Sequence, residues 1–155
     1  MHCILNFIKA LKNKNLFLLE SLDKNTQKLL LAILYLGEGA KSKSTGFLSL
    51  ASSNPRIIRL YLTLLSSCFT IDKRKFRARI QCRADQNIEE LVSYWQEIIN
   101  LAVDQFYPTY TDKRTIGKPT LHLDYKGVCT LHYFDRSIQL ELEILANSVI
   151  EYLTN

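Results

Sequence analysis

The sequence predicts an α+β domain: one sheet, expected to be antiparallel, with helices stacked on one of its faces. Two observations lead to this fold class. Several segments repeat apolar residues at the spacing of an amphipathic helix, whereas residues 75–83 alternate apolar and polar residues strictly, as a half-buried strand does. With 155 residues, of which 47% are apolar and 23% charged, the chain has the size and composition of a single globular domain.

Helix starts are indicated by capping residues. Asp23 or Asn25 is expected to cap a helix that runs to the glycines at 37 and 39, and Asn54 followed by proline caps a second one to about residue 69. Asn87 begins a third helix to about residue 100, and Asp135 begins the last, to residue 153. The first of these is apolar nearly all the way round, so we expect it to be buried on most sides.

Strands are expected between these helices. Residues 46–51, 75–83 and 127–134 have the residue types of strands, and 121–125 is a possible partner of the last one across Lys126-Gly127. Residues 103–119 carry no clear pattern. Residues 1–22 mix apolar and basic residues and are expected to hold a helix and a strand-like piece around 16–19.

Positive charge is concentrated in one segment. The chain has 20 Lys and Arg against 15 Asp and Glu, a net charge of +5 with a pI near 9.0. The alternation in 75–83 places Phe76, Ala78, Ile80 and Cys82 on one face and Lys75, Arg77, Arg79, Gln81 and Arg83 on the other. Arginine matches phosphate and guanine edges, so this face is a candidate for nucleic acid; a merely solvated strand face is the alternative.

One acid stands in an unusual place. Glu38 lies between Gly37 and Gly39 at the end of the first capped helix, where the helix dipole disfavours a negative charge. A carboxylate without a further role gains nothing from this position, because the negative end of the helix dipole repels it. We therefore treat Glu38 as a candidate metal ligand, with a purely structural helix-end carboxylate as the alternative.

These features together resemble a known family. The run LAILYLGEG at 31–39 is similar to the motif of the LAGLIDADG homing endonucleases, with Gly37, Glu38 and Gly39 at its small residue, acid and glycine. The strand and capped helix at 47–62 and the basic strand at 75–83 extend the match. The resemblance implies a domain at 23–155 in which helices cover one face of an antiparallel, saddle-shaped sheet. Residues 1–22 precede this domain, and an extra helix and loop are inserted at about 85–119.

The resemblance also implies a function. Two motif helices would pack through Gly37, Gly39 and Leu34, so the chain would form a homodimer on double-stranded DNA. Paired carboxylates, Glu38 from each copy, would bind Mg²⁺ and make Glu38 the catalytic residue for site-specific phosphodiester cleavage. The DNA contacts would come from a basic set: Lys41, Lys43, Lys73, Lys75, Arg77, Arg79, Gln81 and Arg83.

Two departures from the family pattern leave a second function open. Only residues 40–45 separate the motif from the next strand, and 85–119 interrupts a pair of strands that the endonucleases join directly. The alternative is thus a non-cleaving transcriptional regulator that binds DNA with the same fold. A protein interaction module is a third possibility, which the acid-free basic face disfavours.

Other site chemistry and the cellular setting follow from a few residue types. His122 with Asp124, and His132, can be imagined as a metal or general-base cluster, although histidines on strands are more often structural. The four cysteines form no C-x-x-C pair and are expected to be free thiols. No apolar run approaches the roughly 20 residues of a membrane span, and no leader is recognisable. These observations predict an intracellular protein, in the cytoplasm or an organelle matrix.

Overall fold

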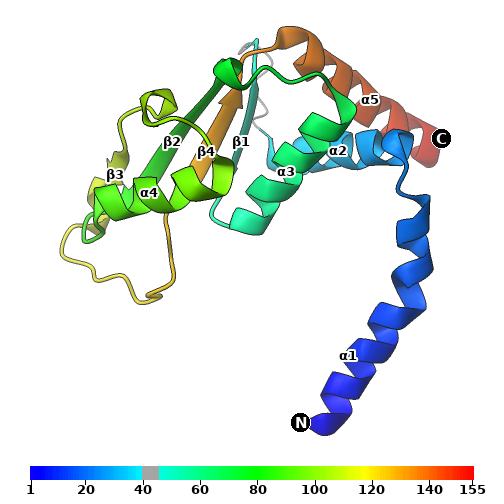
Figure 1. Cartoon of the computed structure of the whole chain (residues 1–155), viewed down its shortest axis with the longest axis horizontal. Helices are drawn as coiled ribbons and strands as arrows, with labels where there is room; N and C mark the ends of the chain where they lie inside the picture. Colours follow the sequence, from blue (N-terminus) through cyan, green and yellow to red (C-terminus); the bar gives the residue numbers. More distant parts are fainter. Residues whose placement is uncertain (40–45) are drawn as a thin grey trace.

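The computed structural model describes residues 1–39 and 46–155 and has an α+β fold (Figure 1). Within these residues there are five α-helices and a four-stranded open sheet. The helices are α1 (His2–Asn15), α2 (Lys24–Glu38), α3 (Pro55–Cys68), α4 (Ile88–Ile99) and α5 (Arg136–Thr154). The strands are β1 (Leu48–Ser52), β2 (Phe76–Arg83), β3 (Tyr110–Asp112) and β4 (Val128–Tyr133).

The capped helices begin where the sequence predicts. The side chain of Asp23 accepts a hydrogen bond from the backbone N–H of Thr26 at 2.8 Å, and Asn54 accepts one from Arg56 at 2.9 Å. Asn87 and Asp135 cap α4 and α5 in the same way. Each cap satisfies N–H groups that the first helical turn leaves unpaired, which is why these positions predict the starts so well.

The sheet is mixed, so the expectation of an antiparallel sheet is wrong. The strand order is β1-β4-β2-β3; β4 runs antiparallel to both of its neighbours, whereas β3 runs parallel to β2. The reason is the segment between β2 and β3. Helix α4 carries the chain back along the sheet, so the next strand enters it in the same direction as β2. The predicted insertion therefore holds both α4 and the parallel edge strand.

Two predicted strand segments take other conformations. Residues 121–125 form no strand, because β4 already pairs with β1 on one side and β2 on the other. The chain instead enters β4 through Gly127, whose φ of +72° and close approach to the carbonyl oxygen of Gln81 leave no space for a Cβ. The strand-like piece at 16–19 lies in a 3-10 helix, η1 (Leu16–Ser21), that follows α1.

The core lies between the sheet and four of the helices. Buried side chains of α2, α3, α4 and α5 form one cluster with the inward residues of β1, β2 and β4. Trp95 of α4 is fully buried, and its indole Nε1–H donates a hydrogen bond to the carbonyl oxygen of Lys126 at 2.7 Å. This bond ties α4 to the entrance of β4, so the inserted helix belongs to the same core.

Helix α2 is buried on one side only, which corrects the expectation that it is buried on most sides. Leu31, Ala32 and Tyr35 reach the core. The opposite side is an outward apolar stripe at helical spacing, about two-fifths exposed, made of Leu29, Leu30, Ile33 and Leu36. Only one side of α2 faces α3, α5 and β1, so the second apolar side has nothing to cover it within the described chain.

Residues 1–22 project from this body as an arm. Helix α1 and η1 extend away from the sheet and the other helices, and every residue of the arm is exposed (Figure 1). None of the helices within residues 1–39 and 46–155 is long and apolar enough to cross a membrane.

Candidate nucleic-acid interface

The outward face of β1, β4 and β2 is the candidate interface. Pairing places Arg77 beside His132 and His132 beside Ser49, while Arg79 lies beside Thr130 and Thr130 beside Ala51. The outward positions of these three strands hold no carboxylate: they are Ser49, Ala51, Val128, Thr130, His132, Arg77, Arg79, Gln81 and Arg83. The arginines that alternation predicts on one face therefore do share one face of the sheet; Ser49 at its β1 side is buried, and Asp112 of β3 lies beside Arg83.

Its β2 side is formed by Arg77, Arg79 and Gln81, of which Arg79 and Gln81 are exposed. Arg77 donates from Nη1 to the carbonyl oxygens of Arg74 and Phe76, at 2.8 and 2.7 Å. The guanidinium of Arg79 lies 5.1 Å from the ring centre of Tyr107, a cation–π distance. Both arginines are thus held in place, and an ordered guanidinium loses less entropy when it binds a phosphate or a base edge.

Two other members of the basic set lie at the margins. Lys75 pairs with Asp135, with Nζ and Oδ2 3.1 Å apart, at the start of α5. Arg83 donates from Nε to the hydroxyl of Thr120 at 3.0 Å and from Nη2 to the carbonyl oxygen of Lys118 at 2.9 Å. These side chains brace loops, so the structure gives Lys75 and Arg83 a structural task that their sequence pattern does not reveal.

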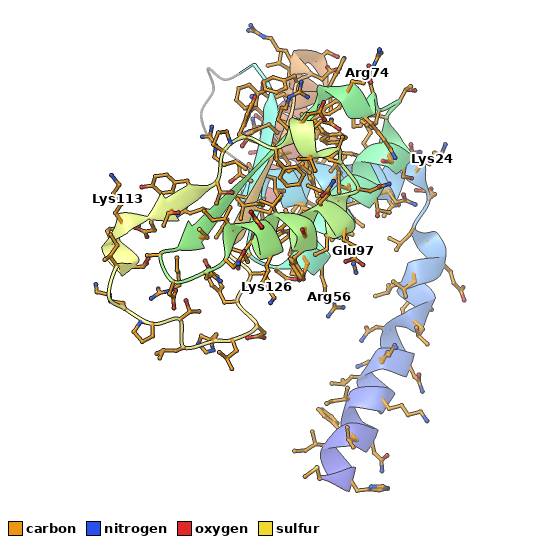
Figure 2. All side chains as sticks on the ribbon, turned by 60° about the vertical axis from the view of Figure 1, so that its left-hand side comes forward. Lys24, Arg56, Arg74, Glu97, Lys113 and Lys126 are labelled. Atoms are coloured by element: carbon orange, nitrogen blue, oxygen red, sulfur yellow. The ribbon has the colours of Figure 1, made fainter. Side chains whose placement is uncertain are left out.

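The turn before β2 is less positive than its sequence implies. Arg74 forms an ion pair with Asp72 at 2.9 Å, and hydrogen bonds from Arg74 lower the pKa of Asp72 to about 2. Lys73, in the 3-10 turn η2 (Lys73–Lys75), is exposed. Arg74 lies at one end of the molecule, far from Arg56 and Lys126 (Figure 2). Of this turn, Lys73 is the residue best placed to extend a basic surface.

An aromatic group that sequence reasoning missed surrounds His132. The ring centres of Phe47, Tyr107 and Phe134 lie 5.2, 6.2 and 6.5 Å from that of His132. Burial lowers the pKa of His132, and the positive charge of Arg79 lowers it further. The imidazole is therefore neutral at pH 7. Its Nδ1 is buried and has no hydrogen-bond partner among the described residues, so a ligand would reach it only if the surrounding rings moved.

No sequence pattern could have found this group. Phe47, Tyr107 and His132 are far apart in the chain, and the register of β4 and the loop before β3 brings them together. His122 does not join them; it lines a separate cavity with Arg83 and Tyr125.

Glu38 ends α2 beside the free edge of the sheet. The following residue, Gly39, forms an isolated antiparallel bridge with Leu50 of β1, so the last turn of α2 is fixed against that edge. A Cβ on Gly39 would lie 2.6 Å from the ring of Tyr35, which requires glycine there within a single chain. Glu38 itself is exposed.

The proposed helix contacts differ in their surroundings. A Cβ on Gly37 would meet nothing within 4 Å, so this glycine faces open space. Leu34 is half-buried and packs against the core, whereas the outward stripe of α2 supplies Leu30, Ile33 and Leu36 beside Gly37. The i, i+3 spacing of that stripe was present in the sequence, but it could not show which side of the helix faces outward.

A metal site would need more than this chain provides in its described part. Residues 1–39 and 46–155 contain no group of three or more His, Cys, Asp or Glu side chains that could hold an ion. Mg²⁺ is usually held by one or two carboxylates together with phosphate oxygens and waters, so Glu38 would need phosphate oxygens of DNA and, for a two-carboxylate site, Glu38 of another copy. Lys41 and Lys43, expected near this place, lie outside the described residues.

Comparisons with known proteins add no assignment. No family model, no curated protein and no solved structure matches this chain.

Proposed function

We propose that this chain binds double-stranded DNA in the manner of the homing endonucleases, with the open sheet face against the duplex. The observation that carries the proposal is the carboxylate-free outward face of β1, β4 and β2, with Arg77, Arg79 and Gln81 along β2. A ribbon of strands fits the major groove, where arginine reads guanine and glutamine reads adenine. Neighbouring phosphates would bind the remaining positive charge.

The proposed cleavage belongs to a homodimer. Two copies would pack through the outward stripe of α2 around Gly37, a contact that brings the two Glu38 carboxylates and the two sheet edges together. Glu38 from each copy would then hold Mg²⁺ against the scissile phosphate. The metal ion would stabilise the charge of the transition state and activate water for hydrolysis.

A non-cleaving regulator is the second candidate. In the described part of its own chain, the exposed Glu38 belongs to no group of three or more His, Cys, Asp or Glu side chains that could hold a metal ion. The aromatic residues near His132 also favour recognition, since they add base or sugar contacts without adding a reacting group. Both candidates share the duplex-binding face and differ only in cleavage.

Duplex binding is tested by a gel shift on randomised DNA. We expect Arg77→Ala/Arg79→Ala to weaken binding and to reduce the log–log salt slope by about 2, about 1 for each phosphate contact removed. The matched control is Arg56→Ala/Arg59→Ala, which removes the same charge from the exposed surface of α3. Equal losses of DNA affinity in the two double variants would show that only the net charge of the chain matters, and would refute this interface.

Cleavage and assembly have separate tests. Glu38→Gln keeps the shape of the side chain and removes its charge, so it should abolish Mg²⁺-dependent cutting and leave duplex affinity equal or higher. Gly37→Leu should reduce the dimer mass measured by light scattering without unfolding the chain, since a side chain there meets open space. A wild type that binds and never cuts, with Mg²⁺ or Mn²⁺, would establish the regulator.

A further inference from the structure

The N-terminal arm, residues 1–22, exposes a large apolar surface to solvent. Every residue in it is exposed, and η1 alone leaves four large apolar side chains uncovered. The side chains of α1 stand clear of the body (Figure 2). An isolated helix of 14 residues is marginal in water, so α1 needs a surface that buries its apolar side.

Helix α1 has the pattern of a docking helix. Ile4, Phe7, Ile8 and Leu11 follow the i, i+3, i+4, i+7 spacing of one apolar stripe. Its charged side chains are Lys9, Lys12 and Lys14, and no acid precedes Glu20. A surface that suits this helix is thus apolar along its middle and negative at its sides.

The same chain carries such a surface on α5. A shallow groove of about 550 Å³ lies between α5 and Lys28 of α2. Its floor includes Leu140 and Ile144, which are 43% and 64% exposed. Lys28 and Glu141 both line the groove and form an ion pair with each other. Outside the lining of the groove, α5 also carries Glu143 and Glu151 against a single arginine, so the net charge of the helix as a whole is opposite to that of α1.

We propose that α1 of one copy of this chain packs its apolar stripe into the α2–α5 groove of a second copy, in a reciprocal exchange of arms. The arm cannot reach the groove of its own chain in the observed conformation, since it leaves α2 pointing away from the body. A second copy covers both apolar surfaces at once and matches their charges, whereas a membrane surface would leave the groove open. The proposal does not depend on DNA binding.

The rate of amide hydrogen exchange in the arm tests this swap of arms directly, because the amides of an undocked helix exchange their hydrogens fast. We expect the amides of α1 to exchange at least about tenfold more slowly in the wild type than in Ile144→Asp, which charges the groove without touching the core. Phe7→Asp/Ile8→Asp should free the arm equally. The matched controls add the same number of charges elsewhere: Asn6→Asp/Asn13→Asp on the polar side of α1, and Ser93→Asp on the exposed side of α4.

Mixing Ile144→Asp with Phe7→Asp/Ile8→Asp distinguishes a swap of arms between two copies from docking of the arm within one chain. Isotope-labelled Ile144→Asp should regain slow exchange in its arm when unlabelled Phe7→Asp/Ile8→Asp is added, because that partner has an intact groove. A protected wild-type arm without such rescue would show docking within one chain. Protection that arises only with phosphatidylglycerol vesicles would assign the arm to lipid. Fast exchange in the wild type at every concentration would also overturn the proposal. A chain that binds no duplex would leave these results unchanged.

Discussion

The two faces of the central sheet differ in burial and in the chemical groups that they carry. On the inner face, Phe76, Ala78, Ile80 and Cys82 of β2 are at most 3% exposed and belong to the core cluster. On the outer face, alternate residues of the same strand present guanidinium and amide groups to solvent. The inner face holds the fold together, while the outer face is free to bind a partner.

This difference separates stability from binding along a single strand. Substitutions on the inner face should change the free energy of unfolding and affect binding only through the unfolded fraction. Substitutions on the outer face should change binding and leave unfolding nearly unaltered.

The largest expected effect is on the inner face of β4. Leu131→Ala should lower the free energy of unfolding by about 3 kcal/mol, because Leu131 is fully buried and a cavity would remain. Urea unfolding followed by circular dichroism measures the change. Its neighbour Thr130 points outward, so Thr130→Ala is the control and should stay within about 0.5 kcal/mol. Similar losses at both positions would contradict the inner and outer assignment.

Gly127 sharpens the comparison at the entrance to β4. Gly127→Ala should cost about 2 kcal/mol, because the residue has φ of +72° and a Cβ would strike the backbone of Gln81. Gly117 also has positive φ, but a Cβ there meets nothing within 4 Å, so Gly117→Ala should cost less. Thermal unfolding of the two variants side by side gives the difference. An equal loss would mean that only the dihedral angle matters.

A buried polar atom on the inner side gives a smaller effect of opposite sign. The hydroxyl of Tyr61 is buried without a hydrogen-bond partner among the described residues, and burial raises its pKa. Tyr61→Phe should therefore raise the free energy of unfolding by about 1 kcal/mol. A loss of stability in urea unfolding would show that the hydroxyl is hydrogen-bonded in solution.

The smallest effect concerns His132 on the outer face. Its pKa is lowered in the folded chain from an ordinary 6.5, so the unfolded chain binds the proton first. Stability should fall as the pH drops below about 6.5 and level off below the folded pKa. His132→Phe should remove this part of the loss, and Arg79→Gln should reduce it. Urea midpoints at about pH 7.5 and about pH 5 test this; an unchanged difference in His132→Phe would exclude His132 as its source.

The helices and most strands could be predicted because their signals are local. Asp23, Asn54, Asn87 and Asp135 cap helices through bonds to N–H groups two or three residues away, and the alternation of 75–83 fixes which side chains of β2 lie on one face. The candidate face followed from the same alternation. The family resemblance and the function of Glu38 remain predictions.

Tertiary structure alone decided the features that depend on distant segments. The parallel pairing of β3 depends on where α4 returns the chain, and the aromatic group at His132 depends on the register of β4. The bracing of Arg83 depends on a loop 35 residues further along, and one apolar side of α2 is outward because its neighbours cover only the other. A sequence determines which residues share a face of a helix or strand; which faces meet depends on the packing of the whole chain.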